Sequence, residues 1–171
     1  MEASPAVRAA TERDIPHLVE LSRLVQDLHV AAHPDVFRPS SDLPSIEDFF
    51  SKSISDTSQH VLVAEVDGMA VGYLCATIER EPAHTFKRDT TRLYVHQVAV
   101  ATNRRRRGIG RALFAAVEQI AQDQSIDDIA LDTWSFNQEA QDFFASLGFS
   151  VYKINLWKRG HRGDKASGRK L

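Results

Sequence analysis

The stretch that decides the fold is Asn103-Arg104-Arg105-Arg106-Arg107-Gly108-Ile109-Gly110-Arg111-Ala112. It follows an apolar run ending at Val98-Ala99-Val100, and apolar residues recur at helical spacing after it. A strand, a basic turn and a helix in this order place unpaired backbone N–H groups at the positive end of a helix dipole. Phosphate groups bind at such helix starts. Gly108 and Gly110 let a ligand approach the main chain closely, so we predict a phosphate-bearing ligand.

Two common nucleotide-binding motifs fit this stretch less well. A P-loop requires Lys followed by Ser or Thr after its second glycine, where this chain has Arg111-Ala112. A dinucleotide fingerprint requires three glycines, and only Gly108 and Gly110 are present. A solvated basic turn, an import signal and a nucleic-acid patch built on the arginines remain alternatives at this point.

The spacing Arg105-x-x-Gly108-x-Gly110 resembles the acyl-CoA pyrophosphate loop of the GCN5-related N-acetyltransferase (GNAT) family, Gln/Arg-x-x-Gly-x-Gly/Ala. The segment from Asn137 to Phe149 is similar to a second pattern of that family, Asn-x-x-Ala-x-x-Leu/Phe-Tyr-x-x-Leu-Gly-Phe, and the opening Val7–Ile15 is similar to its first strand and helix entry. The resemblance covers residues 5–158. It implies an α/β (α+β) GNAT fold, with a mixed central sheet of about six to seven strands and about four helices.

Composition favours one globular domain. The chain has 171 residues, of which 43% are hydrophobic, and its net charge of −2 argues against nucleic-acid binding by bulk charge. We expect a single domain over residues 1–158 and a basic flexible tail over residues 159–171. No apolar run is long enough for a membrane span and no signal peptide is visible, so we expect a cytoplasmic protein without a membrane partner. The single cysteine, Cys75, excludes an internal disulfide and a cysteine metal cluster, and we interpret it as a core residue.

Periodicity and turn residues predict the elements. Helices are expected over 12–31, from Ser45, over 107–124 and over 138–147, and strands over 7–10, 61–66, 69–78, 92–100, 126–134 and 149–157. Segments 34–44 and 79–90 are predicted loops. Thr11 with Asp14 has the form of a capping box, Asp67-Gly68 of a hairpin turn and Gly148 of a helix C-cap.

The resemblance implies where the donor, acetyl-CoA, binds, and it implies no metal. Its pyrophosphate would contact the loop and helix start, namely Arg105, Arg106, Arg107, Gly108, Ile109, Gly110 and Arg111. Its pantetheine arm would pair with the strand Val98–Val100 as an added strand. Asn137 matches a position that contacts this arm, and it is also an N-cap candidate for the helix that begins at Gln138. Phe144 lies in the same motif and is a further candidate for donor contact.

The resemblance also places the catalytic groups on the central strand. A backbone N–H near Val98, where the family has a β-bulge, would polarise the thioester carbonyl. His96 is the candidate base because imidazole titrates near neutral pH. Tyr94 lies on the same face and would position the substrate or a water, whereas Gln97 points to the other face unless the bulge intervenes.

One position departs from the family pattern. Phe144 stands where the general-acid tyrosine is usual, and a phenyl ring has no proton to donate. The thiolate can leave unaided or through water, since a thiol pKa near about 8.5 makes it a tolerable leaving group. A hydroxyl of Tyr152, Ser146 or Ser135 is a second explanation. A domain that binds CoA without turnover is the third.

The predicted function is acetyl-CoA-dependent N-acetyl transfer to a primary amine of a small molecule, peptide or protein, by direct attack on the thioester. The resemblance implies that residues 29–50 and 79–90 shape the acceptor site, with Trp134 and Phe136 either lining it or packing in the core. A non-catalytic acyl-CoA sensor or interaction module is the alternative, and a nucleic-acid-associated protein is a third hypothesis. The resemblance also allows a homodimer formed through strand edges.

Overall fold

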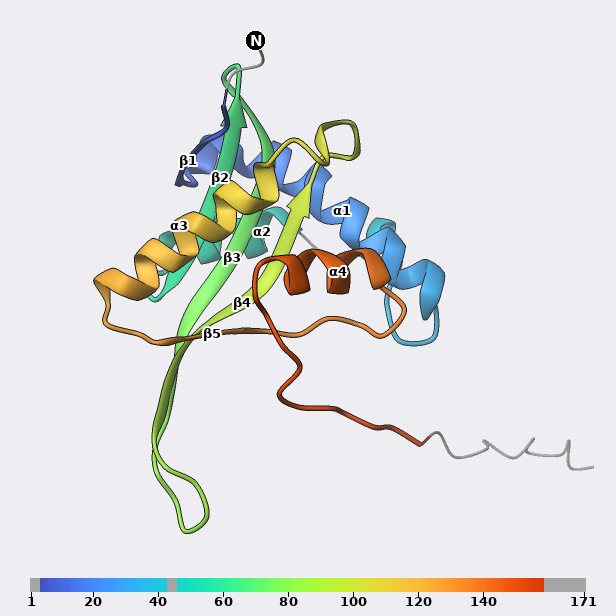
Figure 1. The fold of residues 1–171 in the computed structure, drawn as a ribbon. Coiled ribbons are helices and arrows are strands. Elements are labelled where there is room, and N and C mark those ends of the chain that lie inside the picture. The colour runs from blue at the N-terminus through green and yellow to red at the C-terminus, as the bar shows by residue number, and fades with distance from the viewer. Residues whose placement is uncertain (1–3, 43–45, 159–171) are drawn as a thin grey trace, which may run out of the picture. The chain divides into compact units, whose positions relative to one another are not determined.

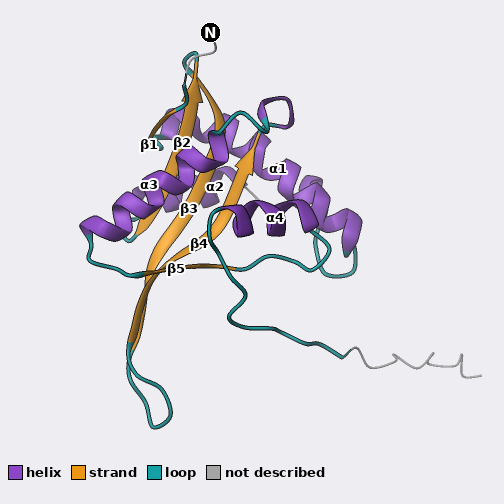
Figure 2. Cartoon of the chain, in the orientation of Figure 1, coloured by secondary structure: helices purple, strands orange, loops and turns teal. Residues whose placement is uncertain are grey.

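The structure is a computed structural model that describes residues 4–42 and 46–158. The chain divides into two compact units, one up to Asn137 and one from Gln138 onward. The first unit contains a five-stranded sheet in the order β1-β2-β3-β4-β5 (Figures 1 and 2). The strands are β1 (Ala6–Ala9), β2 (Gln59–Val66), β3 (Met69–Glu81), β4 (Thr90–Val100) and β5 (Asp128–Leu131). The first four are antiparallel neighbours and β5 is parallel to β4, which confirms the mixed sheet with fewer strands than expected.

The described residues form four α-helices, as predicted. The first unit holds α1 (Ile15–Ala32), α2 (Ile46–Ser55) and α3 (Ile109–Asp123), and the second unit holds α4 (Gln138–Ser146). Figure 1 shows α1 and α2 on one face of the sheet and α3 on the other. Short 3-10 turns precede α1 at Glu12–Asp14, precede α2 at Ser40–Asp42 and follow β4 at Thr102–Arg104. The predicted helix start at Ser45 and the predicted tail 159–171 lie outside the described residues.

The two faces of the sheet are packed by alternating strand residues. On the α1 and α2 face, Leu18 and Phe50 pack with Val63 and Tyr73 in one fully buried cluster. Each such side chain contributes about 1.5–3 kcal/mol relative to exposure. The other face is covered by the apolar stripe of α3, with Leu113, Phe114 and Val117 buried.

One glycine sets how closely α3 approaches the sheet. A Cβ atom at Gly72 of β3 would lie 3.0 Å from Ile109 Cγ2 and 3.1 Å from the carbonyl oxygen of Ala99. A larger residue would therefore push the first turn of α3 away from β3 and β4. Glycine at this position allows the start of α3 to lie against the end of β4. The connection between them, residues 101–108, is called the arginine loop below.

Three local predictions are confirmed by the backbone. Asp67 and Gly68 have φ values of 53° and 78°, which are those of the expected two-residue hairpin turn. Gly148 has a φ of 92° just after α4, the left-handed conformation of a C-cap glycine. The Thr11 backbone N–H donates to Asp14 Oδ2 at 2.7 Å, as a capping box requires.

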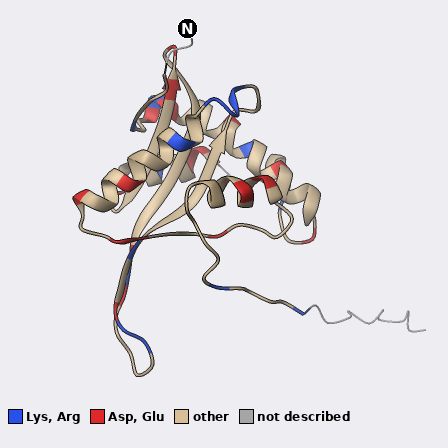
Figure 3. Cartoon of the chain, viewed as in Figure 1, with Lys and Arg blue, Asp and Glu red and all other residues tan. Residues whose placement is uncertain are grey.

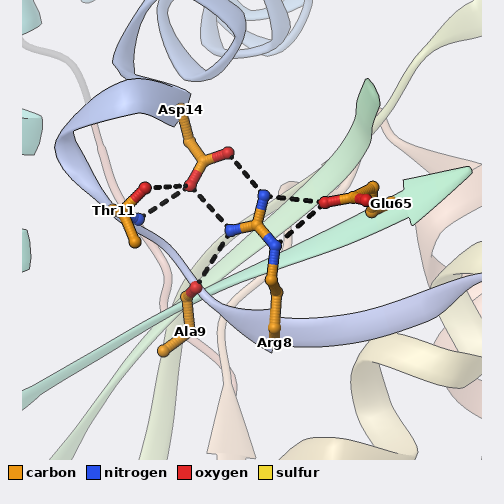
Figure 4. A network of polar contacts seen from close by, with 5 residues as sticks. All are labelled: Arg8, Ala9, Thr11, Asp14 and Glu65. Atoms are coloured by element: carbon orange, nitrogen blue, oxygen red, sulfur yellow. Dashed lines mark hydrogen bonds and ion pairs between the residues drawn. The ribbon is translucent and has the colours of Figure 1, made fainter. Parts of the chain in front are cut away.

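An arginine ties the first strand to the entry of α1 (Figure 4). Arg8 on β1 donates to both oxygens of Asp14, at 2.8 and 2.9 Å, and its Nε donates to Glu65 Oε2 on β2 at 2.9 Å. The hydrogen bond with Arg8 is the main reason why the pKa of Asp14 is lowered to about 2. The sheet edge and the first helix are thereby joined through a carboxylate that is itself buried.

The predicted loop over residues 79–90 is too long. The ladder between β3 and β4 continues through Glu79↔Arg92 to Glu81↔Thr90, which leaves only residues 82–89 as the connection. Ion pairs support the extension: Arg92 contacts Glu79 at 2.7 Å, and Lys87 pairs with Glu81. The polar composition of this segment indicated a loop. In the structure, oppositely charged side chains pair across the two strands of a hairpin and stabilise it. Figure 1 shows this hairpin extending beyond the other strands.

The predicted last strand over residues 149–157 is wrong, because no strand is present between Phe149 and Lys158. Its large apolar residues are exposed instead: Val151, Tyr152, Ile154, Leu156 and Trp157. Alternating apolar residues form a strand only when a neighbouring strand pairs with them, and this segment has no ladder partner in the described part of the chain. The strand predicted over 126–134 is likewise shorter, at Asp128–Leu131.

Cys75 is buried, as predicted, and burial raises the pKa of its thiol to about 12. Among the described residues, no helix combines the length and the apolar character that a membrane crossing requires. The cytoplasmic location and the homodimer stay predictions.

Candidate active site

Strands β4 and β5 separate halfway along β4. The parallel ladder between β4 and β5 runs only from Arg92↔Asp128 to Val95↔Leu131, whereas β4 continues to Val100. Beyond Val95, the edge of β4 that faces β5 therefore has no strand neighbour within residues 4–42 and 46–158. An extended group with its own amides can pair with such an edge. The edge includes Val98–Val100, where the sequence predicts the pantetheine arm.

A β-bulge lies where the strands separate. Cys75 of β3 pairs with Gln97, and the next residue, Ala76, pairs with Val95, so His96 is an extra residue in β4. The bulge thus comes two residues before Val98, which is back in register opposite Leu74. A bulge removes a backbone group from the ladder and turns side chains out of the normal alternation. The backbone pairing and the side-chain directions of β4 are therefore altered next to its unpaired edge.

Both residues at the bulge are hydrogen-bonded to β3. The Tyr73 hydroxyl donates to Gln97 Oε1 at 3.0 Å, and His96 Nε2 lies 2.7 Å from Thr77 Oγ1. Tyr73 and Thr77 lie two residues on either side of Cys75, and therefore on the same face of β3. Adjacent residues of a regular strand point to opposite faces, so the bulge has brought Gln97 and His96 to one face. Sequence analysis missed Thr77, because no local pattern marks a cross-strand partner.

Tyr94 lies beside the histidine on the same strand. Its ring centroid is 5.0 Å from that of His96, and the Arg92 guanidinium lies 5.2 Å from its ring centroid. Burial raises the pKa of Tyr94, and a hydrogen bond with the Asp132 side chain raises it further. The phenol is therefore neutral at physiological pH and acts as a hydrogen-bond donor. Asp132 directly follows β5, so it lies at the point where β5 leaves β4, and sequence analysis did not single it out.

The arginine loop has the backbone shape of an anion site. After the 3-10 turn Thr102–Arg104, Arg106 adopts a φ of 60° and Gly108 a φ of 80°. The first helical bond of α3 runs from the Ala112 N–H to the Gly108 oxygen at 2.9 Å. The N–H groups of residues 109–111 therefore precede the intrahelical ladder. Figure 3 shows the basic residues gathered on this loop at the end of β4.

A cluster of five aromatic rings joins the end of α1 to the segment that follows β5. The cluster consists of His29, His33, Phe37, Trp134 and Phe136. His29 stacks on Phe37 with centroids 4.7 Å apart, and Phe37 meets Trp134 edge to face at 5.1 Å. Burial lowers the pKa of His29, which favours the neutral form of its ring. The segment 29–50, which was predicted to shape the acceptor site, is thus in contact with Trp134 and Phe136.

The remaining predicted positions lie at the end of the first unit and in the second unit. Asn137 immediately precedes α4, and its own N–H donates to the Trp134 oxygen at 3.0 Å. Phe144 lies on α4, with its ring centroid 5.6 Å from Phe143 and 6.0 Å from Phe149. Of the alternative proton donors, the Ser146 hydroxyl donates to the Phe143 oxygen at 2.7 Å, and Tyr152 lies in the segment that forms no strand.

The chain thus combines an open strand edge at a bulge with a helix start that directly follows the same strand. The sequence model of the Acetyltransferase (GNAT) family matches residues 22–149, and the chain belongs to that family.

Two named relatives illustrate the similarity. The chain is 23% identical over 159 residues to an uncharacterized N-acetyltransferase in the pepI 3′ region of Lactobacillus delbrueckii subsp. lactis, covering 88% of this chain and 87% of that protein. It is 31% identical over 100 residues to N-acetyltransferase 8B of Mus musculus, covering 56% of this chain and 41% of that protein. The chain thus spans less than half of the mouse protein.

Solved structures give the same fold. The tetramutant of the BH1408 protein from Bacillus halodurans superimposes with a TM-score of 0.85 at 26% identity, covering 90% of this chain and 99% of that one. The aminoglycoside N-acetyltransferase AAC(6')-Iy in complex with CoA superimposes with a TM-score of 0.73 at 18% identity, covering 94% of this chain and 97% of that one.

Proposed function

We propose that this protein is an acetyl-CoA-dependent N-acetyltransferase that transfers an acetyl group to a primary amine by direct attack on the thioester. The observation that carries the proposal is the separation of β4 from β5 at a bulge occupied by His96, on the strand that runs into the arginine loop. Donor, base and anion site can thus be supplied by one strand and the helix start that follows it.

The donor would lie along β4. The pyrophosphate would be bound by backbone N–H groups at the start of α3, around Gly108 and Gly110, with charge support from Arg105 and Arg107. The amides of the pantetheine arm would pair with the open edge at Val98–Val100. The relative bound to CoA has the same fold, which supports this placement.

The reaction needs one proton to leave the amine and one C–S bond to break. His96 would accept the proton of the attacking amine, directly or through a water, with Tyr94 positioning the substrate or that water. The amine nitrogen would then attack the thioester carbon, while a backbone N–H at the bulge, near Val98, stabilises the oxyanion. Collapse of this intermediate would release the acetamide and the CoA thiolate.

Departure of the thiolate would need no protein acid. Phe144 has no proton to give, and the Ser146 hydroxyl already donates to a backbone oxygen. A thiol of pKa near about 8.5 is a weak enough base to leave as thiolate and take its proton from solvent.

The acceptor would approach between the aromatic cluster and the bulge. Trp134 and Phe136 pack against the end of α1 and bring apolar surface next to Asp132, which contacts Tyr94. Such surroundings suit an amine with an apolar or aromatic body. A small molecule, a peptide N-terminus and a lysine side chain all satisfy this description.

The test is acceptor-dependent release of CoA thiol from acetyl-CoA across a panel of small amines and peptides. We expect release with at least one acceptor and a loss of about 10²-fold or more in kcat for His96→Ala, the range that a general base contributes. His17→Ala, which removes an exposed histidine of α1, is the matched control and should leave kcat unchanged. Tight acetyl-CoA binding without release for any acceptor would contradict the proposal and favour the sensor.

A further inference from the structure

We infer that Thr77 is a positioning residue for His96: its hydroxyl oxygen accepts the Nε2–H and so makes Nδ1 the basic nitrogen. This inference rests on the proposed function, in which His96 takes the proton of the attacking amine. It assigns a task to a residue of β3 that lies one strand away from the separation of β4 and β5.

The contact is short and specific. His96 Nε2 lies 2.7 Å from Thr77 Oγ1, within the usual range of a strong hydrogen bond. Within residues 4–42 and 46–158, the other ring nitrogen, Nδ1, has no side-chain partner. One nitrogen of the imidazole is therefore held by the protein while the other is available to substrate or water.

The direction of this hydrogen bond decides whether the ring can act as a base. A hydroxyl can donate or accept, and a neutral imidazole has one N–H and one lone pair. If Thr77 donated its proton to Nε2, the lone pair would be occupied and the available nitrogen would carry a proton. If Thr77 accepts, the lone pair is on Nδ1. Only the second arrangement gives a general base on the accessible side.

The bulge explains why the histidine needs such a partner. His96 is an extra residue with no partner of its own in the β3 ladder, and its side chain is exposed. Thr77, by contrast, is in register opposite Tyr94, and its β-branched side chain has few χ1 rotamers. A fixed hydroxyl on the regular strand thus orients a ring that the bulge has freed. The Tyr94 ring, 5.0 Å away, further limits its rotation.

The discriminating pair of variants is Thr77→Val and Thr77→Ser. Valine keeps the branched shape and the β-propensity of threonine and replaces the hydroxyl by a methyl group, whereas serine keeps the hydroxyl. We expect Thr77→Val to lower kcat roughly tenfold through loss of base orientation, with the KM for acetyl-CoA within about twofold of wild type. Thr77→Ser should retain kcat within about threefold.

A second readout needs no turnover. In protein labelled with ¹⁵N at histidine, the ring-nitrogen resonances report which nitrogen carries the proton, and His96→Gln identifies the signals. At a pH where the ring is neutral, we expect the proton on Nε2 in wild type and Thr77→Ser, and a mixture of tautomers in Thr77→Val. A wild-type proton on Nδ1, or unchanged kcat and tautomer in Thr77→Val, would overturn the inference.

The two proposals fail in different ways. If wild-type protein neither binds acetyl-CoA nor releases thiol, the proposed function is wrong, and the tautomer alone then decides whether Thr77 orients the ring. If turnover is present and is lost in His96→Ala but not in Thr77→Val, the function stands and the inference about Thr77 is wrong.

Discussion

The hydroxyl of Tyr73 donates a 3.0 Å hydrogen bond to the side-chain oxygen of Gln97, across the two longest strands of the sheet. Tyr73 is almost fully buried, and burial raises the pKa of its hydroxyl, so the group stays a donor at physiological pH. This bond ties the residue after His96 to the α1 and α2 core. Strand β4 is thus hydrogen-bonded to β3 at both residues of its bulge, by Tyr73 at Gln97 and by Thr77 at His96.

Removing the anchor should destabilise the fold. Tyr73→Phe leaves the Gln97 oxygen without its donor, and we expect the free energy of unfolding in urea to fall by about 1–2 kcal/mol. The double variant Tyr73→Phe/Gln97→Met removes both polar groups and should recover part of that loss. Equal stability of Tyr73→Phe and wild type would show that the bond does not stabilise the bulge.

Alanine variants of two glycines should distinguish the effect of backbone strain on stability from an effect on ligand binding. Gly68 and Gly108 have φ values of 78° and 80°, and a Cβ atom at either would meet nothing within 4 Å. Alanine at either position should therefore cost about 1–2 kcal/mol of stability through the left-handed conformation alone. Only Gly108→Ala should also weaken acetyl-CoA binding in calorimetry, because Gly68 lies in the β2–β3 turn. Equal affinities of the two variants would argue against a pyrophosphate site at Gly108.

The Arg8–Asp14 pair predicts a pH-dependent stability. The pKa of Asp14 is lowered from 3.8 to about 2, mainly by its hydrogen bond to Arg8. The contribution of ionised Asp14 to the free energy of unfolding is thus complete above about pH 5 and is lost as the pH falls through about 4 to 2. Because Arg8 is half-exposed, solvent weakens the pair, and we expect it to contribute about 1–2 kcal/mol to the free energy of unfolding. In urea unfolding, the difference between wild type and Arg8→Gln should be constant at neutral pH and shrink below about pH 4. A difference that grows on acidification would contradict this assignment.

Phe144 offers a direct test of how the thiolate leaves. Phe144→Tyr places a hydroxyl where the family pattern has one. If CoA departs unaided, this variant should change kcat by less than about threefold, because protonation of the leaving group is not limiting. Solvent isotope effects on thiol release should be the same in both proteins. A rise of about 10²-fold in kcat would instead mean that the natural chain lacks a needed acid.

Sequence patterns predicted the elements that depend on local signals. The Asp67-Gly68 turn, the capping carboxylate of Asp14 and the C-cap at Gly148 each follow from backbone preferences of a few residues, and each is present. The spacing of Arg105, Gly108 and Gly110 likewise predicted the loop that connects β4 to α3.

Features that depend on pairing between distant segments were not predictable in this way. The bulge at His96, its contact with Thr77 and the effect of Asp132 on the pKa of Tyr94 all depend on the register of neighbouring strands. The prediction of a strand over 149–157 was wrong for the same reason, because an alternating pattern does not indicate whether a partner strand is present. Charge pairs extended the β3–β4 hairpin where polar composition had indicated a loop.

The most direct test of the central claim is calorimetric titration of the protein with acetyl-CoA, alongside Gly110→Glu. Glutamate at the start of α3 places a carboxylate where the pyrophosphate would bind, and like charges at that position should prevent binding. We predict saturable binding by wild type and none by Gly110→Glu, with both proteins folded by circular dichroism. No binding by wild-type protein at millimolar acetyl-CoA, or equal binding by the two proteins, would contradict the placement of the donor on this loop.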